Sequence, residues 1–118
     1  MASASQVLTG IVAVLHVYFM VLEMFLWATP FGAKTFKRPL AEQEQSKVLA
    51  ANQGLYNGFL AAGLAWSFFA TGGHDIRVFF LSCVVIAGLY GGLTASRAIL
   101  FVQALPATAA LAVTMLAT

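Results

Sequence analysis

Four long apolar runs dominate the pattern of hydrophobic and polar positions along this chain. They cover Val7–Ala28, Ala50–Ala70, Arg77–Thr94 and Ala98–Ala117. A helix that spans a bilayer needs about 20 mostly apolar residues, so each run is long enough, or nearly so, to cross a membrane. Short segments containing Gly, Pro or Ser separate the runs, as expected for turns. The pattern predicts an all-α fold, a four-helix transmembrane bundle.

The second helix is expected to begin before the membrane, near Pro39. Proline suits the first turn of a helix because its missing N–H is not needed there. Glu42 and Glu44 follow, where the helix dipole favours acidic residues. With Lys47 they are expected to form a solvated cytoplasmic extension. The predicted helices then cover residues 7–28, 39–70, 77–94 and 98–117 of a single integral membrane domain, 1–118.

Composition supports a membrane location. Of the 118 residues, 61% are hydrophobic and only 8% are charged, whereas soluble domains are typically about 25% charged. The formal net charge of +2 is too small and too localised to indicate a nucleic-acid partner. Cys83 is the single cysteine, so no intramolecular disulfide can form.

The basic residues predict the orientation of the helices. Five of the six lie on the side of the first and third connections, and one lies on the other side. In chain order they are Lys34, Lys37, Arg38, Lys47 and Arg97 on one side, and Arg77 on the other. Because basic residues concentrate in cytoplasmic loops, the two termini are expected on the non-cytoplasmic side. The expected location is the bacterial inner (plasma) membrane.

Two ionisable residues, His16 and Glu23, lie inside the first apolar run. A charged side chain at the bilayer centre costs ~2.5–3.5 kcal/mol on insertion scales, so such residues usually have a function. Seven residues at about 100° each return a helix to within about 20° of its starting face, so both residues share one stripe, roughly 10 Å apart. His16 and Glu23 are therefore the candidate catalytic groups.

A polar patch follows at the start of the second run, comprising Asn52, Gln53, Tyr56 and Asn57. An unpaired amide in hydrocarbon costs several kcal/mol, so these groups must face other helices or trapped water. The first two helices run antiparallel, which brings the patch to the depth of Glu23. His16 lies deeper and needs another partner, for which Tyr90 and Gln103 are candidates. We expect these polar groups to line one cavity and to bind substrate.

Other features have simpler explanations. Amides between membrane helices often serve only to hold them together, and a buried neutral histidine can be structural. His74, beside Asp75, is expected in a surface loop. The pairs Gly54/Gly58 and Gly88/Gly92 predict close helix packing, and Pro106 is expected to kink the last helix. No spacing of His and Cys residues suggests a metal site.

Several runs resemble a known family. They are His16-Val-Tyr-Phe-Met-Val-Leu-Glu-Met-Phe-Leu-Trp27, Asn52-Gln-Gly-Leu-Tyr-Asn-Gly-Phe-Leu60, Val85-Ile-Ala-Gly-Leu-Tyr-Gly-Gly-Leu-Thr94 and Gln103-Ala-Leu-Pro106. The chain resembles the small bacterial and fungal membrane proteins grouped as domain of unknown function thirteen-oh-four. The resemblance covers nearly the whole chain and implies a small multi-pass membrane protein, but it transfers no reaction.

Three functions agree with these features. The first is an intramembrane enzyme that does acid–base chemistry on a small lipophilic molecule, of the isomerase or cofactor-free oxygenase type. The second is a proton-coupled small transporter or channel subunit, which at this size needs a homo-oligomer to enclose a pathway. The third is a structural or accessory membrane subunit. The sequence assigns no cofactor, although His16 is also a candidate haem ligand.

Overall fold

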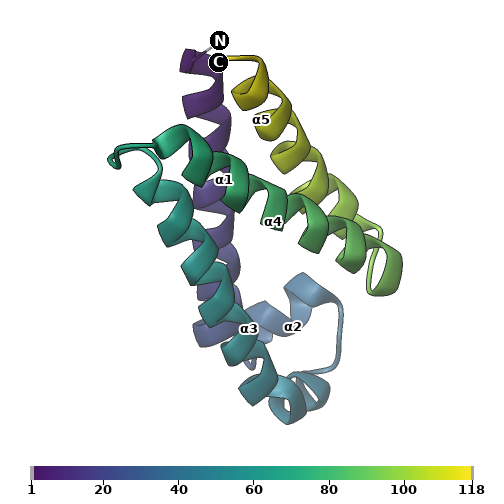
Figure 1. The fold of residues 1–118 in the computed structure, drawn as a ribbon. Helices are drawn as coiled ribbons and strands as arrows, with labels where there is room; N and C mark the ends of the chain where they lie inside the picture. Colours follow the sequence, from purple (N-terminus) through teal and green to yellow (C-terminus); the bar gives the residue numbers. More distant parts are fainter. Residues whose placement is uncertain (1, 118) are drawn as a thin grey trace. The chain divides into compact units, whose positions relative to one another are not determined.

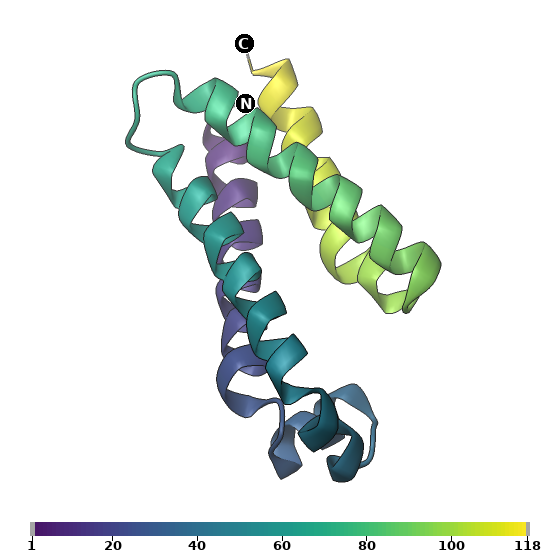
Figure 2. The same ribbon diagram turned by 60° about the horizontal axis from the view of Figure 1, so that its bottom comes forward.

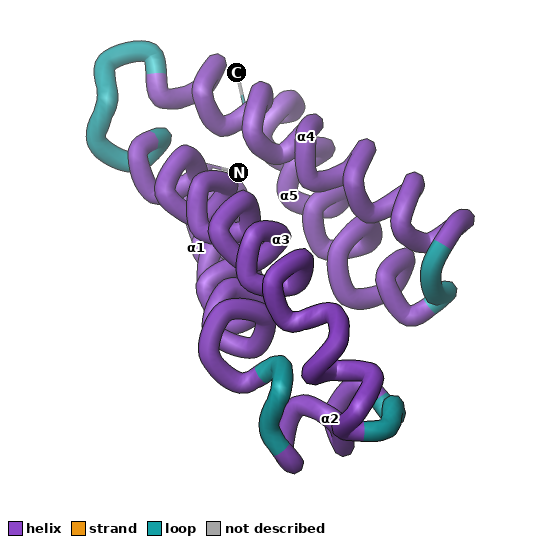
Figure 3. The backbone as a smooth tube through the Cα atoms, turned by 90° about the horizontal axis from the view of Figure 1, so that it is seen from below, coloured by secondary structure: helices purple, strands orange, loops and turns teal. Residues whose placement is uncertain are grey.

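The computed structural model describes residues 2–117, and all regular elements in this range are helical (Figure 3). In chain order they are α1 (Ala2–Val21), the π-helical turn η1 (Leu22–Leu26), α2 (Pro30–Phe36), α3 (Leu40–Trp66), α4 (Gly73–Thr94), the π-helical turn η2 (Leu100–Ala104) and α5 (Leu105–Leu116) (Figure 1). The predicted all-α class is confirmed.

The ends of the helices differ from the predicted ones. α1 begins at Ala2 rather than at residue 7, because the polar residues before the apolar run can continue its backbone hydrogen bonds. α3 begins at Leu40, one residue later than predicted, and ends at Trp66, four residues before Ala70. Hydrophobicity locates the centre of such helices better than their ends, since helix ends depend on local backbone geometry.

The start of α4 corrects the expectation that His74 lies in a loop. Gly72 adopts a left-handed conformation, with φ of 76°, and α4 begins at the next residue. Glycine takes this conformation without steric cost, so the chain can turn sharply and enter the helix at once. His74 and Asp75 therefore lie in the first turn of α4, and Arg77 lies one turn into it.

A short helix that the hydrophobic pattern does not predict, α2, occupies the first loop. The Thr29 side chain caps it by accepting a hydrogen bond from the backbone N–H of Gly32, and Pro30 occupies its first turn. Lys37 ends it in the left-handed region, with φ of 55°. Residues at both ends therefore determine where this helix begins and ends, although it has only seven residues.

The chain forms two compact units. The first consists of Met1–Val14 together with Leu60–Thr118, and the second is Leu15–Phe59. Helices α1 and α3 each contribute one part to each unit.

The first unit has an apolar core made by residues from α1, α3, α4 and α5. Its fully buried members are Val12, Leu64, Leu81, Val84, Ala107 and Ala110. α4 runs antiparallel to η2 and α5 (Figure 2). The two segments approach closely at Gly88, where an added Cβ would lie 2.6 Å from the backbone nitrogen of Ala104. The close packing predicted from Gly88 and Gly92 is confirmed.

The second unit packs the later part of α1 and η1 against the early part of α3. An added Cβ on Gly54 would lie 2.7 Å from Cγ of Met24, and one on Gly58 would lie 2.8 Å from Sδ of Met20. Later residues of α3 thus meet earlier residues of α1, so the two segments are antiparallel. The close helix packing predicted at Gly54 and Gly58 is confirmed, and their partners are the end of α1 and η1.

Polar side chains are buried and large apolar side chains are exposed to an unusual degree. The buried polar residues are Ser5, Thr9, His16, Gln43, Asn57, Ser67 and Thr114. In contrast, Phe69 and Leu93 are 85% and 82% exposed. Two helical segments, Ser3–Leu26 and Gly73–Thr94, are long and apolar enough to cross a membrane, and the apolar segment Leu100–Leu116 is shorter.

Candidate functional site

Glu23 lies in the π-helical turn η1 at the end of α1. Such turns are rare and often occur at functional sites. The second π turn, η2, has a local cause, since Pro106 lacks the N–H that a regular helix would use. η1 is also followed by a proline, Pro30, but that residue begins the separate helix α2. The candidate acid–base group therefore lies in a π-helical turn at the end of the first long helix.

Asn57 provides the partner of Glu23. Its side-chain nitrogen donates a hydrogen bond of 2.5 Å to Oε1 of Glu23, and the Asn57 residue is only 6% exposed. Gly54, one turn earlier in α3, allows this approach, because an added Cβ there would lie 3.0 Å from Cβ of Glu23. The expected contact between Glu23 and the polar patch is confirmed, and Asn57 makes it.

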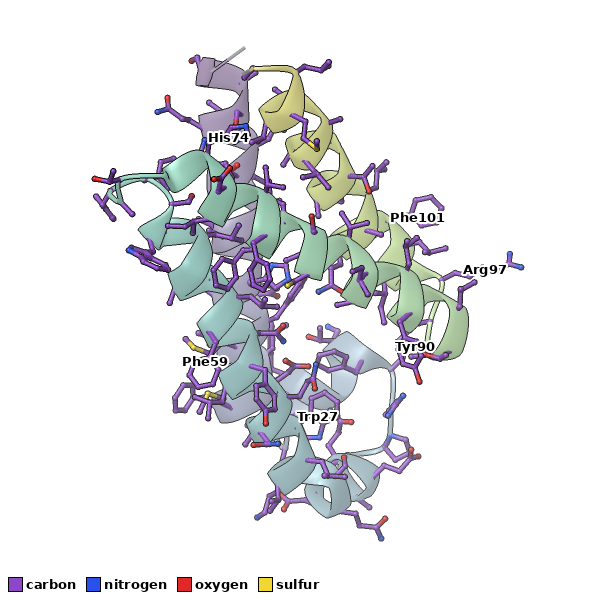
Figure 4. All side chains as sticks on the ribbon, in the orientation of Figure 1. Trp27, Phe59, His74, Tyr90, Arg97 and Phe101 are labelled. Atoms are coloured by element: carbon purple, nitrogen blue, oxygen red, sulfur yellow. The ribbon has the colours of Figure 1, made fainter. Side chains whose placement is uncertain are left out.

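The other members of the polar patch lie on the exposed side of α3. Asn52 and Gln53 are exposed, and Tyr56 is 53% exposed. The Tyr56 ring makes an edge-on contact with Phe59, whose side chain is labelled in Figure 4, with 6.0 Å between the ring centroids. Asn57 thus faces Glu23, whereas its three polar neighbours face outward. Their proposed role in binding substrate stays a prediction.

His16 is fully buried in the regular part of α1. Its ring packs edge-on against Phe19, with 5.1 Å between the centroids. The other two candidates, Tyr90 and Gln103, belong to the first unit. Tyr90 is 71% exposed, and Gln103 lies in η2, where the Leu105 N–H bonds to the carbonyl of Leu100. The predicted kink before Pro106 thus takes the form of a π turn.

Gln43 is a buried polar residue that the sequence reasoning missed. Its side-chain nitrogen donates a 3.1 Å hydrogen bond to the backbone carbonyl of Trp27, just after η1. Trp27 in turn donates from its ring nitrogen to the Ser46 hydroxyl, at 3.0 Å. A sequence signal exists, because the buried residues Gln43, Ala50, Asn57 and Leu64 follow one another at intervals of seven. This stripe extends the buried face of α3 back to Gln43.

Comparison with known proteins identifies the family. A family model described as protein of unknown function, DUF1304, matches residues 10–115. The chain belongs to this family. The uncharacterized protein YpaA of Lactococcus lactis subsp. lactis (strain IL1403) is 33% identical over 100 residues, which make up 82% of this chain and 84% of the relative. No solved structure matches the chain significantly.

Membership of DUF1304 confirms the resemblance drawn from the sequence runs. The matched region includes His16, Glu23, Gln43 and Asn57. The family description names no reaction.

The bond from Gln43 to Trp27 predicts a difference between two glutamines of this DUF1304 protein. Gln43→Ala should lower the free energy of unfolding by about 1–3 kcal/mol, because it removes a buried side chain and leaves a carbonyl unpaired. Gln45 lies two residues further along α3 and is exposed, so Gln45→Ala should change stability by less than about 0.5 kcal/mol. Chemical denaturation in detergent micelles measures both. Equal effects would contradict the anchoring role of Gln43.

Proposed function

We propose that this protein is an integral membrane enzyme that transfers protons on a small lipophilic molecule. The observation that carries the proposal is the hydrogen bond from the buried Asn57 amide to the Glu23 carboxyl group in the π-helical turn η1. Ionisable residues within apolar helices are rare and usually functional. A simple packing contact does not require an ionisable group.

The distribution of side chains supports a membrane environment. Helix contacts in membranes favour small residues and side chains such as Ser, Thr, Asn and His, while the lipid-facing surface is apolar. Both features occur here: Ser5, Thr9 and His16 are buried along α1, whereas Val7 and Val14 are 60% and 68% exposed. A soluble monomer rarely exposes such a large apolar surface.

The remaining spans and the orientation complete the proposed topology. The apolar part of α3 and the segment Leu100–Leu116 join the two long spans in a four-helix transmembrane bundle. The basic residues of the first and third connections support an orientation with those connections in the cytoplasm and both termini on the non-cytoplasmic side.

The geometry of Glu23 supports a role as general base and acid. Asn57 binds Oε1, whereas Oε2 has no hydrogen-bond partner among the described residues. A carboxylate with one oxygen fixed can use the other to take a proton from a carbon next to a substrate carbonyl. The C–H electron pair enters the enolate, and the same carboxyl group returns the proton to a different carbon. This isomerisation balances without an oxidant, and His16 is the second proposed proton-transfer group.

Glu23→Gln should abolish proton transfer while the protein stays folded. Glutamine has the same shape and still accepts a hydrogen bond from Asn57, but it does not exchange a proton with the substrate. Native mass spectrometry of the gently purified protein identifies the retained lipophile. Deuterium incorporation from D₂O into that lipophile, followed by NMR, then measures the activity. We expect a loss of about 10²–10⁴-fold, the usual contribution of a general acid–base group.

Glu44→Gln is the matched control, because Glu44 is exposed in the cytoplasmic extension of α3 and pairs with Lys47 at 3.3 Å. Its rate of deuterium incorporation and its melting temperature should equal those of the wild type. Unchanged exchange in Glu23→Gln, or a wild-type protein that retains no lipophile, would contradict the enzyme proposal. Proton flux in proteoliposomes that depends on Glu23 would support the transporter alternative instead.

A further inference from the structure

The first unit contains a small cleft that the sequence reasoning did not anticipate. Its lining residues come from the start of α1, the start of α4 and the end of α5, three helix ends that lie near one another in Figure 1. Its volume is about 170 Å³, and its lining residues are Ser5, Gln6, His74, Arg77, Thr114 and Ala117. All of them belong to the first unit, whereas Glu23 and Asn57 belong to the second.

Arg77 is held in a fixed position beside this cleft. Nη1 donates a 3.0 Å hydrogen bond to the Ser5 hydroxyl, and Nε donates a 3.2 Å hydrogen bond to the Ser67 hydroxyl. The guanidinium carbon also lies 4.6 Å from the centroid of the Phe68 ring. Two of its five N–H groups are thus used, and three have no partner among residues 2–117. Because the guanidinium is already ordered, binding a ligand costs little additional side-chain entropy.

The surrounding groups leave the charge of Arg77 uncompensated inside the cleft. The Ser5 and Thr114 hydroxyls are hydrogen-bonded to each other at 2.5 Å. His74, labelled in Figure 4, directs Nε2 at the Thr114 carbonyl at 3.2 Å. Since a carbonyl only accepts, Nε2 carries the proton. Asp75, the one acidic side chain among the described residues of the first unit, lies 3.5 Å from Nδ1 of His74 and is 97% exposed.

We propose that this cleft binds a phosphate group through Arg77. The guanidinium presents paired N–H donors that match the oxygens of a phosphate. The cleft is smaller than the roughly 300–1,000 Å³ of sites that enclose a whole drug-sized molecule, so it fits a single group of phosphate size. Ser5, Gln6 and Thr114 add polar side chains to the lining of the cleft.

The phosphate can come from a lipid headgroup or from solution, and the position of the cleft favours the lipid. It lies at the ends of the apolar segments Ser3–Leu26, Gly73–Thr94 and Leu100–Leu116. If these segments span a membrane, their ends lie at the level of the lipid headgroups. Exposed aromatic side chains at this end of the unit, Trp66 and Phe69, fit the same level.

Native mass spectrometry of the full chain with added lipid tests the proposal. The probes are phosphatidylglycerol, diacylglycerol as a lipid without phosphate, and inorganic phosphate alone. Wild-type protein should retain phosphatidylglycerol and not diacylglycerol. Arg77→Gln should weaken this binding by about 10- to 100-fold, the usual effect of losing hydrogen bonds to a charged group. Arg97→Gln removes the same charge from the connection after α4, outside the cleft, and should bind like the wild type.

Arg77→Lys covers the case in which Arg77→Gln does not fold. Lysine keeps the charge but not the paired donors, so a folded Arg77→Lys protein should still bind phosphatidylglycerol more weakly than the wild type. If inorganic phosphate binds in an Arg77-dependent way and phosphatidylglycerol does not, the phosphate site is supported and its lipid source is rejected. Equal retention of phosphatidylglycerol and diacylglycerol, equal losses in Arg77→Gln and Arg97→Gln, or full binding by Arg77→Lys would overturn the proposal.

Discussion

Replacing Gly88 with alanine should destabilise the first unit, whereas the same change at Gly10 should stabilise it. An added Cβ at Gly88 would lie 2.6 Å from the Ala104 nitrogen and 2.8 Å from the Ala104 Cα. These are backbone atoms, so relief requires η2 to move away from α4. Overpacking of this kind costs about 1–3 kcal/mol. At Gly10 nothing lies within 4 Å of an added Cβ, and alanine gains up to about 1 kcal/mol of helix propensity.

The two variants should therefore differ in unfolding free energy by about 1–3 kcal/mol, with Gly88→Ala the less stable of the two. Each is a Gly→Ala change within a helix, so the comparison cancels the intrinsic preference of alanine for helices. Reversible denaturation in micelles, followed by circular dichroism, measures the difference. If Gly88→Ala is as stable as Gly10→Ala, α4 and η2 do not pack through Gly88.

The sequence was sufficient to predict the helical class and the main pairs of packed helices. Glycines at intervals of four marked the close approach at Gly54 and Gly58 and at Gly88 and Gly92, because only a residue without a side chain permits such contacts. The sequence did not predict α2, since this helix depends on the cap at Thr29 and the left-handed residue Lys37 rather than on a hydrophobic period. The hydrophobic pattern of a sequence says little about local backbone geometry of this kind.

Only part of the candidate site was predicted from the sequence. The contact between Glu23 and the polar patch was predicted because the two lie at the same depth in antiparallel helices. Depth alone does not specify which residues of α3 face Glu23. Asn57 and Gly54 lie on the buried face of α3. Asn52, Gln53 and Tyr56 lie on the other side of the helix and are exposed. The residues of the phosphate cleft are far apart in the sequence: Ser5 contacts Thr114 across 109 positions. No local pattern predicts such a contact.

Placing an arginine in the middle of α4 should sharply reduce membrane insertion. Ile86 lies well inside Gly73–Thr94 and is 67% exposed, so its side chain faces lipid in the proposed arrangement. An arginine at the centre of a spanning helix costs about 2.5–3.5 kcal/mol on insertion scales. Ile86→Arg should therefore shift the equilibrium between inserted and non-inserted chains by roughly two orders of magnitude. The fraction of the full chain that resists carbonate extraction from membranes measures this shift.

Leu93→Arg provides the control, because Leu93 is 82% exposed but is the second-to-last residue of α4. There the long arginine side chain can reach the headgroup region, so insertion should change much less. The two substitutions also distinguish a helix that lies in a membrane from one that is exposed to water. In water, an arginine at Ile86 would replace an exposed apolar side chain and improve solubility. A folded, monomeric Ile86→Arg protein that needs no detergent would therefore contradict the proposed membrane span, because the same substitution has opposite effects in the two solvents.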